Sequence, residues 1–150
     1  MSLTVFEGLQ SEIYVPITPK SIFTPVTKPL KEMRIALASA CGAHLKSDKR
    51  FNLAGDTSFR VIPDETPTSD LMISHGGYDN SDANKDINCM FPLDRLHDLV
   101  KEGFIKETAP YHYGFMGGGG DQTAFHDITG PEIARQLKAE DVDGVILTAG

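Results

Sequence analysis

The chain has 150 residues, of which 40% are hydrophobic and 23% charged, and this composition is typical of one folded globular domain. Lys and Arg total 14 against 21 Asp and Glu, so the net charge of -7 disfavours nucleic acid and anionic membranes as partners. Because the sequence contains neither an apolar run long enough to span a bilayer nor a secretory leader, we predict a cytoplasmic protein without a membrane span.

Residues 1–30 are predicted to form an N-terminal proline-rich arm, and residues 31–150 an α/β domain. The segment 16–29 holds four of the nine prolines, which fix φ and disfavour helix. The apolar run MRIALASA, residues 33–40, predicts a strand that is buried on both faces. The segment 41–59 is then expected to be a long functional or ligand-covering loop, with a short helix inside it as the alternative.

Two short strands and a helix are predicted next. The strands are FRVI at 59–62 and LMIS at 71–74, and the polar segment 75–88 follows the second of them directly. Pro92 is expected to begin a helix that Gly103 ends. Its apolar face would be formed by Leu93, Leu96, Leu99 and Val100.

The last third of the chain repeats the alternation of strand and helix. Residues 111–116 predict a strand that runs into the glycines 117–120. A second helix is expected after Thr129, because Thr129 and Glu132 have the spacing of a capping box. Residues 142–150 predict a final strand. The order of elements predicts an α/β fold, a mostly parallel sheet with flanking helices, in which the last βα unit is incomplete.

Several motifs fit a structural role better than a catalytic one. The glycine run 117–120 matches neither a dinucleotide fingerprint nor a phosphate loop, so a turn is favoured. Residues 82–87 begin like a calcium loop but lack its glycine and its bidentate glutamate, so no metal site is predicted. Cys41 and Cys89 do not have the spacing of a redox or zinc motif, and we predict two buried thiols.

The histidines differ in their sequence context. His75 follows a predicted strand inside the polar segment, where a general acid, a general base or a carboxylate-binding group would be placed. His97 lies beside Asp98 and off the leucine stripe of its helix, which predicts a solvated imidazole. His112 and His126 have no context that favours one role.

Four segments carry a family resemblance: residues 44–56, 74–96, 114–122 and the final VDGVILTAG. They resemble the selenoprotein subunits of clostridial D-proline reductases and, more distantly, the selenoprotein B components of glycine, sarcosine and betaine reductases. The HGGYDN motif is shared with the whole group, whereas the glycine run and the N-terminal residues point to the proline enzymes. The resemblance extends over nearly the whole chain.

The resemblance implies a reaction and the groups that perform it. In this family a selenocysteine follows a strand such as 142–150. We therefore expect one directly after Gly150 and a chain truncated there, since ordinary decoding reads UGA as stop. The implied reaction is reductive cleavage of the ring C–N bond of D-proline to 5-aminovalerate, with the selenolate as nucleophile. A pyruvoyl group on a partner subunit would activate the substrate, and a dithiol protein would donate electrons. The chain itself would hold no cofactor and would act within a hetero-oligomer.

The shared motif and the end of the last strand supply candidates for substrate binding or loop ordering. These are His75, Asp79, Asn80, Asn84, Asp86, Thr148 and Gly150. The alternative for the polar segment is that it hydrogen-bonds to itself and caps the sheet. Three other functions remain open at this point: a component B of a glycine, sarcosine or betaine reductase, a non-catalytic domain that binds a small molecule or partner, and a racemase that pairs Cys41 with Cys89 across a cleft.

Overall fold

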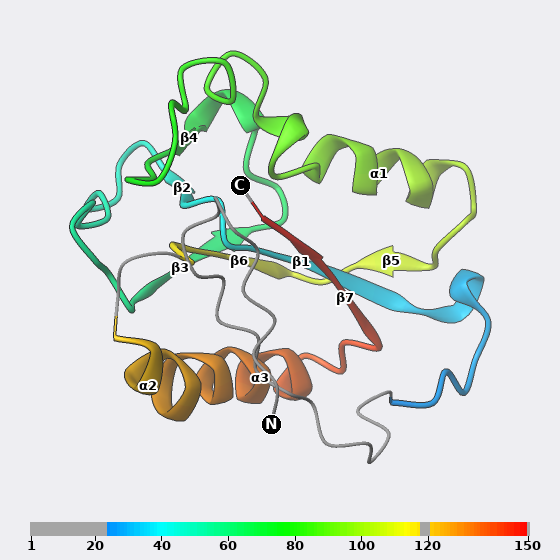
Figure 1. The fold of residues 1–150 in the computed structure, drawn as a ribbon. Coiled ribbons are helices and arrows are strands. Elements are labelled where there is room, and N and C mark those ends of the chain that lie inside the picture. Colours follow the sequence, from blue (N-terminus) through cyan, green and yellow to red (C-terminus); the bar gives the residue numbers. More distant parts are fainter. Residues whose placement is uncertain (1–23, 118–120, 150) are drawn as a thin grey trace, which may run out of the picture.

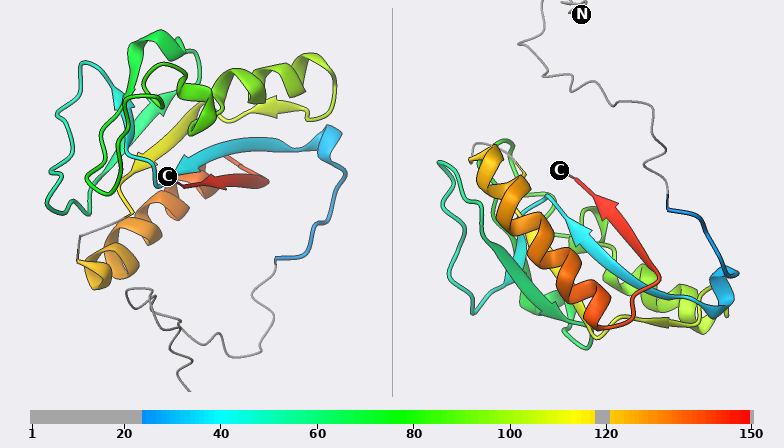
Figure 2. Two further views of the ribbon diagram at one scale, coloured as in Figure 1. Left: turned by 45° about the horizontal axis from the view of Figure 1, so that its top comes forward. Right: turned by 90° about the horizontal axis from the view of Figure 1, so that it is seen from below.

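The computed structural model describes residues 24–117 and 121–149, and it confirms the predicted α/β fold (Figure 1). A central sheet lies between two helical layers. One face is covered by α1 (Leu93–Lys101), and the opposite face by α2 (Gln122–Ala124) and α3 (Gly130–Ala139), as the two views of Figure 2 show. The predicted N-terminal arm lies mostly outside the described residues.

The main sheet is built around β1 (Arg34–Ser39), whose sequence RIALAS is buried almost throughout because neighbouring strands and both helical layers surround it. β7 (Gly144–Thr148) pairs with one side of β1 in parallel. The other side pairs in parallel with β5 and β6, and β3 is antiparallel to β6. The bounds of these three strands are Glu107–Thr108, Tyr111–Phe115 and Phe59–Pro63.

A second sheet of two antiparallel strands, β2 (Ala43–Leu45) and β4 (Leu71–Ile73), lies on the same side as α1. β2 falls inside the segment that we expected to be loop or helix, so that prediction is wrong for these residues. Gly42 makes the tight connection from β1, since its φ of 79° favours glycine and a Cβ there would overlap the Ser74 carbonyl. The same side of the main sheet holds the larger apolar core.

The first helix follows its sequence signals closely. α1 begins one residue after Pro92, buries Leu93 and Leu96, and ends before Gly103, whose φ of 73° is the left-handed conformation of a helix C-terminus. Short 3-10 turns precede β1, β4 and α1. They span Leu30–Glu32, Thr68–Asp70 and Ile87–Cys89.

The second helix begins earlier than its capping-box spacing predicts. Its N-cap is Asp121, whose carboxylate accepts hydrogen bonds from the backbone N–H groups of Thr123 and Ala124. The helix then passes through a π-helical turn, Phe125–Thr129, directly into α3. Thr129 is therefore helical rather than a cap, and its hydroxyl donates to the Thr57 carbonyl. Glu132 pairs instead with Arg135.

Candidate functional site

The candidate site lies at the carboxyl end of the parallel strands, where α/β proteins place their ligands. Ala40 follows β1, and its backbone N–H donates to the Thr148 carbonyl at the end of β7 over 2.9 Å. The Thr148 hydroxyl donates to the Met90 carbonyl over 2.7 Å, and the Ser39 hydroxyl donates to the same oxygen over 3.3 Å. The ends of β1 and β7 are thus held against the segment that leads into α1.

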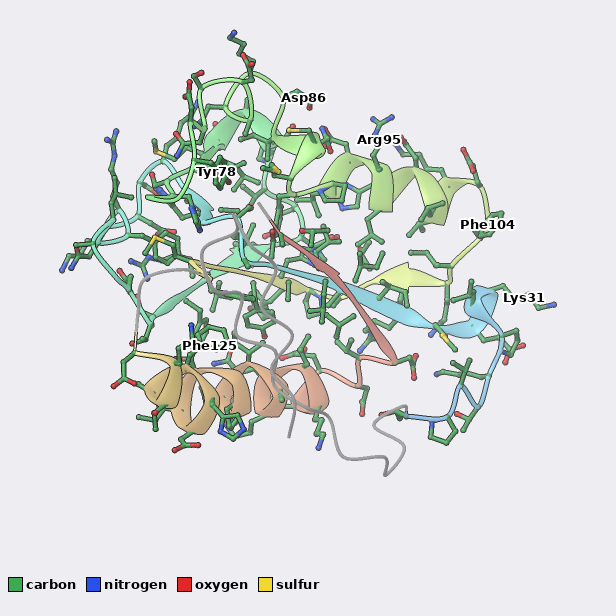
Figure 3. All side chains as sticks on the ribbon, in the orientation of Figure 1. Lys31, Tyr78, Asp86, Arg95, Phe104 and Phe125 are labelled. Atoms are coloured by element: carbon green, nitrogen blue, oxygen red, sulfur yellow. The ribbon has the colours of Figure 1, made fainter. Side chains whose placement is uncertain are left out.

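The polar segment 75–88 reaches this carboxyl edge through Tyr78, which is labelled in Figure 3. The Tyr78 hydroxyl donates to the Cys41 carbonyl over 3.1 Å, and its ring stacks on His75 with 4.8 Å between ring centroids. Burial raises the pKa of Tyr78 to about 12, so the phenol stays protonated and keeps this hydrogen bond near neutral pH. Tyr78 therefore fixes the position of the His75 ring relative to the end of β1.

His75 has its two ring nitrogens in different roles. Nδ1 accepts a hydrogen bond from the Gly77 backbone N–H over 2.9 Å, which places the proton of the neutral ring on Nε2. Burial lowers the pKa of His75, and this favours the neutral ring further. Among the described residues none accepts a hydrogen bond from Nε2. The arrangement therefore suits donation of one hydrogen bond to a bound anion or carbonyl.

Asn84 and Asn80 connect the polar segment to the end of β4. Asn84 accepts from the Ile73 backbone N–H over 2.8 Å and donates to the Ile73 carbonyl over 2.9 Å, as a neighbouring strand would. It also donates to the Asn80 carbonyl over 2.9 Å, and the Asn80 amide donates to the His75 carbonyl over 3.0 Å. The Asn80 side chain thus bonds the backbone of its own segment, and the Asn84 side chain bonds both that backbone and the end of β4.

The two acidic candidates make local turns. Asp79 accepts from the Ser81 backbone N–H over 3.0 Å, and Asp86 accepts from the Asn88 backbone N–H over 3.0 Å. Both side chains are exposed. The candidates His75, Asn80 and Asn84 are thus brought together. Thr148 lies at the strand end described above, and Gly150 lies outside the described residues.

The two cysteines occupy different environments, so the prediction of two buried thiols is wrong for Cys89. Cys41 is fully buried after β1, and burial raises the pKa of its thiol. Cys89 is exposed because the 3-10 turn directs Ile87 toward the core instead. Cys41 is therefore suited to packing, and Cys89 is the accessible thiol of the pair.

A second polar cluster, between α1 and the amino end of β6, was missed by sequence reasoning. The Asp64 carboxylate accepts hydrogen bonds from His97 Nε2 over 2.8 Å, from His112 Nε2 over 2.9 Å and from the Thr108 hydroxyl over 2.7 Å. His112 is fully buried, and its Nδ1 accepts from the Leu37 backbone N–H over 3.0 Å. His97 is consequently a half-buried hydrogen-bond partner of Asp64 rather than the solvated imidazole we expected.

The Asp64 carboxylate of this cluster is ionised at neutral pH. Burial raises the pKa of Asp64, but the hydrogen bonds from His112, Thr108 and His97 outweigh it and hold the pKa at about 2. Both ring nitrogens of His112 have protein partners, so this ring has no free position for a ligand. No sequence spacing links Asp64, His97 and His112, because they come from a strand end, a helix and another strand.

Across 24–117 and 121–149, no three His, Cys, Asp or Glu side chains are grouped so that they could hold a metal ion. None of the helices in this part of the chain has the length and apolar character needed to cross a membrane.

Comparison with known proteins places this sequence in a family. The family model described as glycine/sarcosine/betaine reductase selenoprotein B matches residues 7–150. The D-proline reductase subunit gamma of Acetoanaerobium sticklandii is 68% identical over 148 residues, which are 99% of this chain and 61% of that protein. The glycine reductase complex component B subunit gamma of Carboxydothermus hydrogenoformans is 32% identical over 95% of this chain and 34% of its own length.

A sarcosine reductase complex component B subunit beta of Peptoclostridium acidaminophilum is 28% identical over 95% of this chain and 34% of that protein. No solved structure matches the chain significantly. The chain thus spans less than two thirds of the length of these relatives. It belongs to the glycine/sarcosine/betaine reductase selenoprotein B family.

Proposed function

We propose that this chain is part of an oxidoreductase subunit, the selenoprotein subunit of a D-proline reductase, which cleaves the ring C–N bond of D-proline to give 5-aminovalerate. The observation that carries this proposal is the 68% identity to a D-proline reductase subunit gamma over 99% of the chain. The glycine and sarcosine reductase relatives are 32% and 28% identical, so a component B of those complexes is the less supported alternative.

The nucleophile of this reaction is proposed to lie in the part of the longer subunit that follows residue 150. A selenolate there would supply a nucleophile that is ionised near neutral pH. The carboxyl end of β7 suits its presentation, because Thr148 is held by the Ala40 N–H and by the Met90 carbonyl and Ala149 adds little side-chain bulk. Activation of the amine is proposed to come from a pyruvoyl group on a partner subunit, and electrons from a dithiol protein.

Within this chain, His75 is the proposed substrate-binding residue. Its Nε2–H points to no acceptor among the described residues, and stacking on Tyr78 fixes the ring near the end of β1. A neutral imidazole N–H can donate one hydrogen bond to the carboxylate of an amino acid. Asn80 and Asn84 are proposed to order the segment that carries His75.

The experiment that tests the proposed activity uses the full-length subunit, expressed with selenocysteine insertion and assembled with its pyruvoyl-containing partner. We expect dithiol-dependent formation of 5-aminovalerate from D-proline and none from L-proline. Glycine, sarcosine and betaine serve as competing substrates. Reduction of one of these three instead of D-proline would assign the chain to a component B complex.

Two further measurements test the proposed position of the selenocysteine and the alternative of a non-catalytic binding domain. The codon that follows Gly150 in the gene is expected to be UGA; any other codon would contradict the proposed position of the selenocysteine. Titration of the described domain with D-proline tests the non-catalytic binding module, which predicts affinity without any partner subunit. Absence of such binding, together with activity of the assembled enzyme, supports the reductase.

A further inference from the structure

Strand β7 is exposed on both of its faces. The exposed fractions are 37% for Val145, 39% for Ile146 and 74% for Leu147. Ile146 pairs with Leu37, which belongs to the core beneath α1, whereas Leu147 pairs with Ala38, which belongs to the core beneath α3. Exposed apolar side chains are therefore directed toward both helical layers, and neither layer extends over β7. Figure 2 shows β7 at the margin of the sheet.

The opposite margin of the sheet is protected. β3 carries Arg60 and Pro63 within its five residues. The Arg60 guanidinium donates to the Lys49 carbonyl over 2.9 Å and lies 4.3 Å from the centre of the Phe51 ring, so the neighbouring loop is fastened along the strand. Charges, prolines and covering loops are the usual protection of an edge strand against further pairing.

β7 has none of these features, since its sequence GVILT contains no charge and no proline. A continuous apolar sequence is typical of parallel strands that are buried on both faces by helices. The side of β7 away from β1 also has no partner strand among the described residues. The sequence and the surroundings of β7 therefore disagree: it has the sequence of an interior strand and the position of an edge strand.

We propose that β7 is an interior strand of the intact subunit, with its free edge paired and its faces covered by polypeptide of the same subunit that lies beyond the matched region. The relative of 68% identity has this additional length, because 148 matched residues make up only 61% of it. A parallel strand receives its next neighbour through a crossover that covers one face of the sheet, so the additional polypeptide can supply the pairing together with the covering of a face.

A second copy of the chain fits these observations less well. Two β7 strands that paired across a twofold axis would extend the sheet, but they would leave Val145, Ile146 and Leu147 exposed on its faces. The family relationship supports this inference, and D-proline chemistry does not enter it. Failure of the proposed activity and failure of the proposed covering are thus separate results.

Site-specific crosslinking in the assembled full-length enzyme tests the proposal. The photoreactive residue p-benzoylphenylalanine replaces Leu147, and in a matched control it replaces the exposed Phe104 at the end of α1. We expect light to link position 147 to a peptide from the continuing chain of the same subunit, in a yield at least tenfold above the control. A link to another subunit, to a second copy or to residues 1–23, or a yield equal to that of the control, would overturn it.

A stability comparison gives an independent readout in the same full-length subunit. Leu147→Lys places a charge in the proposed interior, whereas Val61→Lys places one on the protected edge strand β3, where the wild-type side chain is 38% exposed. We expect Leu147→Lys to lower Tm by about 5 °C or more, or to abolish soluble expression, and Val61→Lys to change Tm by about 1 °C. Equal effects of the two variants would contradict an interior position of β7.

Discussion

Histidine lies beside polar partners at two places, the amino end of β6 beneath α1 and the carboxyl end of the parallel strands, and the two places use it differently. At the amino end, both ring nitrogens of His112 are bonded within the protein, to the Leu37 N–H and to Asp64. At the carboxyl end, His75 uses one ring nitrogen to order its own loop and leaves Nε2 without a partner among the described residues. A closed set of hydrogen bonds stabilises the fold, whereas an open donor is available to a ligand.

The two clusters also differ in how deeply their histidines are buried. His112 is fully buried, so loss of its partners would leave polar groups without hydrogen bonds in a low-dielectric interior. His75 is only partly buried, and its segment is held by side-chain hydrogen bonds as well as by the packing of Ala83 and Ile87 into the core. Substitutions at the amino end should therefore affect stability, and substitutions at the carboxyl end should affect binding and activity.

The largest expected effect is that of His112→Ala. The substitution leaves a cavity in the core and removes hydrogen bonds from the Leu37 N–H and from Asp64, so the free energy of unfolding should fall by about 3 kcal/mol. Chemical denaturation of the purified protein measures it. His126→Ala is the control, because His126 is exposed on the π-helical turn. A loss below about 1 kcal/mol would show that the amino-end cluster is not a structural centre.

Acid should weaken the amino-end cluster through Asp64. The pKa of Asp64 is held at about 2, below its ordinary value of 3.8, so its contribution is fully present above about pH 4 and is lost as the pH falls toward 2. We expect a contribution of about 2 kcal/mol. The measurement is the difference in unfolding free energy between the wild type and Asp64→Asn at pH 5 and at pH 2.5. A difference that does not shrink on acidification would refute the stabilisation of the Asp64 carboxylate by its hydrogen bonds.

Asn84→Ala tests whether the carboxyl-end loop depends on side-chain hydrogen bonds. Its amide bonds the N–H and the carbonyl of Ile73 and the carbonyl of Asn80, so we expect a loss of about 1 kcal/mol in stability. Hydrogen exchange should become faster in the peptide that contains His75. Asn52→Ala is a suitable control, because among the described residues the exposed Asn52 side chain bonds only the backbone N–H of Ala54. Unchanged exchange at His75 would mean that other contacts order the loop.

His75→Ala tests the carboxyl-end site, since it should leave the free energy of unfolding nearly unchanged while it weakens substrate binding. In the assembled reductase the loss of one donor to the substrate carboxylate should reduce kcat/KM for D-proline roughly tenfold, mostly through KM. His75→Gln keeps an N–H donor and should recover part of the activity. His126→Gln is the matched control on an exposed histidine. An unchanged KM in His75→Ala would remove His75 from the substrate site.

Much of the fold could be predicted because its signals are local. The apolar run of β1, the leucine stripe of α1 and the end of that helix at Gly103 depend on neighbouring residues, and the structure confirms each of them. The start of the second helix was predicted wrongly because two local capping signals compete there. Asp121 caps the helix, and a π-helical turn carries the helix past Thr129.

The contacts of the candidate sites could not be predicted from neighbouring residues alone. His75 could be singled out because it directly follows β4, but the tautomer of its ring depends on the Gly77 N–H and its position on Tyr78. The Asp64 cluster joins residues from β5, β6, α1 and the end of β3, and no pattern along the chain connects them. Cys89 was assigned to the interior from residue type alone, whereas the turn that carries it faces outward.

Properties of consecutive residues were enough to identify the α/β class, the family and the polar segment at the carboxyl end of the sheet, because periodicity and motifs are local. The hydrogen-bond partners of the histidines became known only from the folded structure, in which His112 uses both ring nitrogens within the protein and His75 keeps Nε2 without an acceptor among the described residues. The folded structure also places the apolar strand β7 at an edge of the sheet. Hydrogen-bond partners and burial arise from elements distant in the chain, so only the folded molecule determines them.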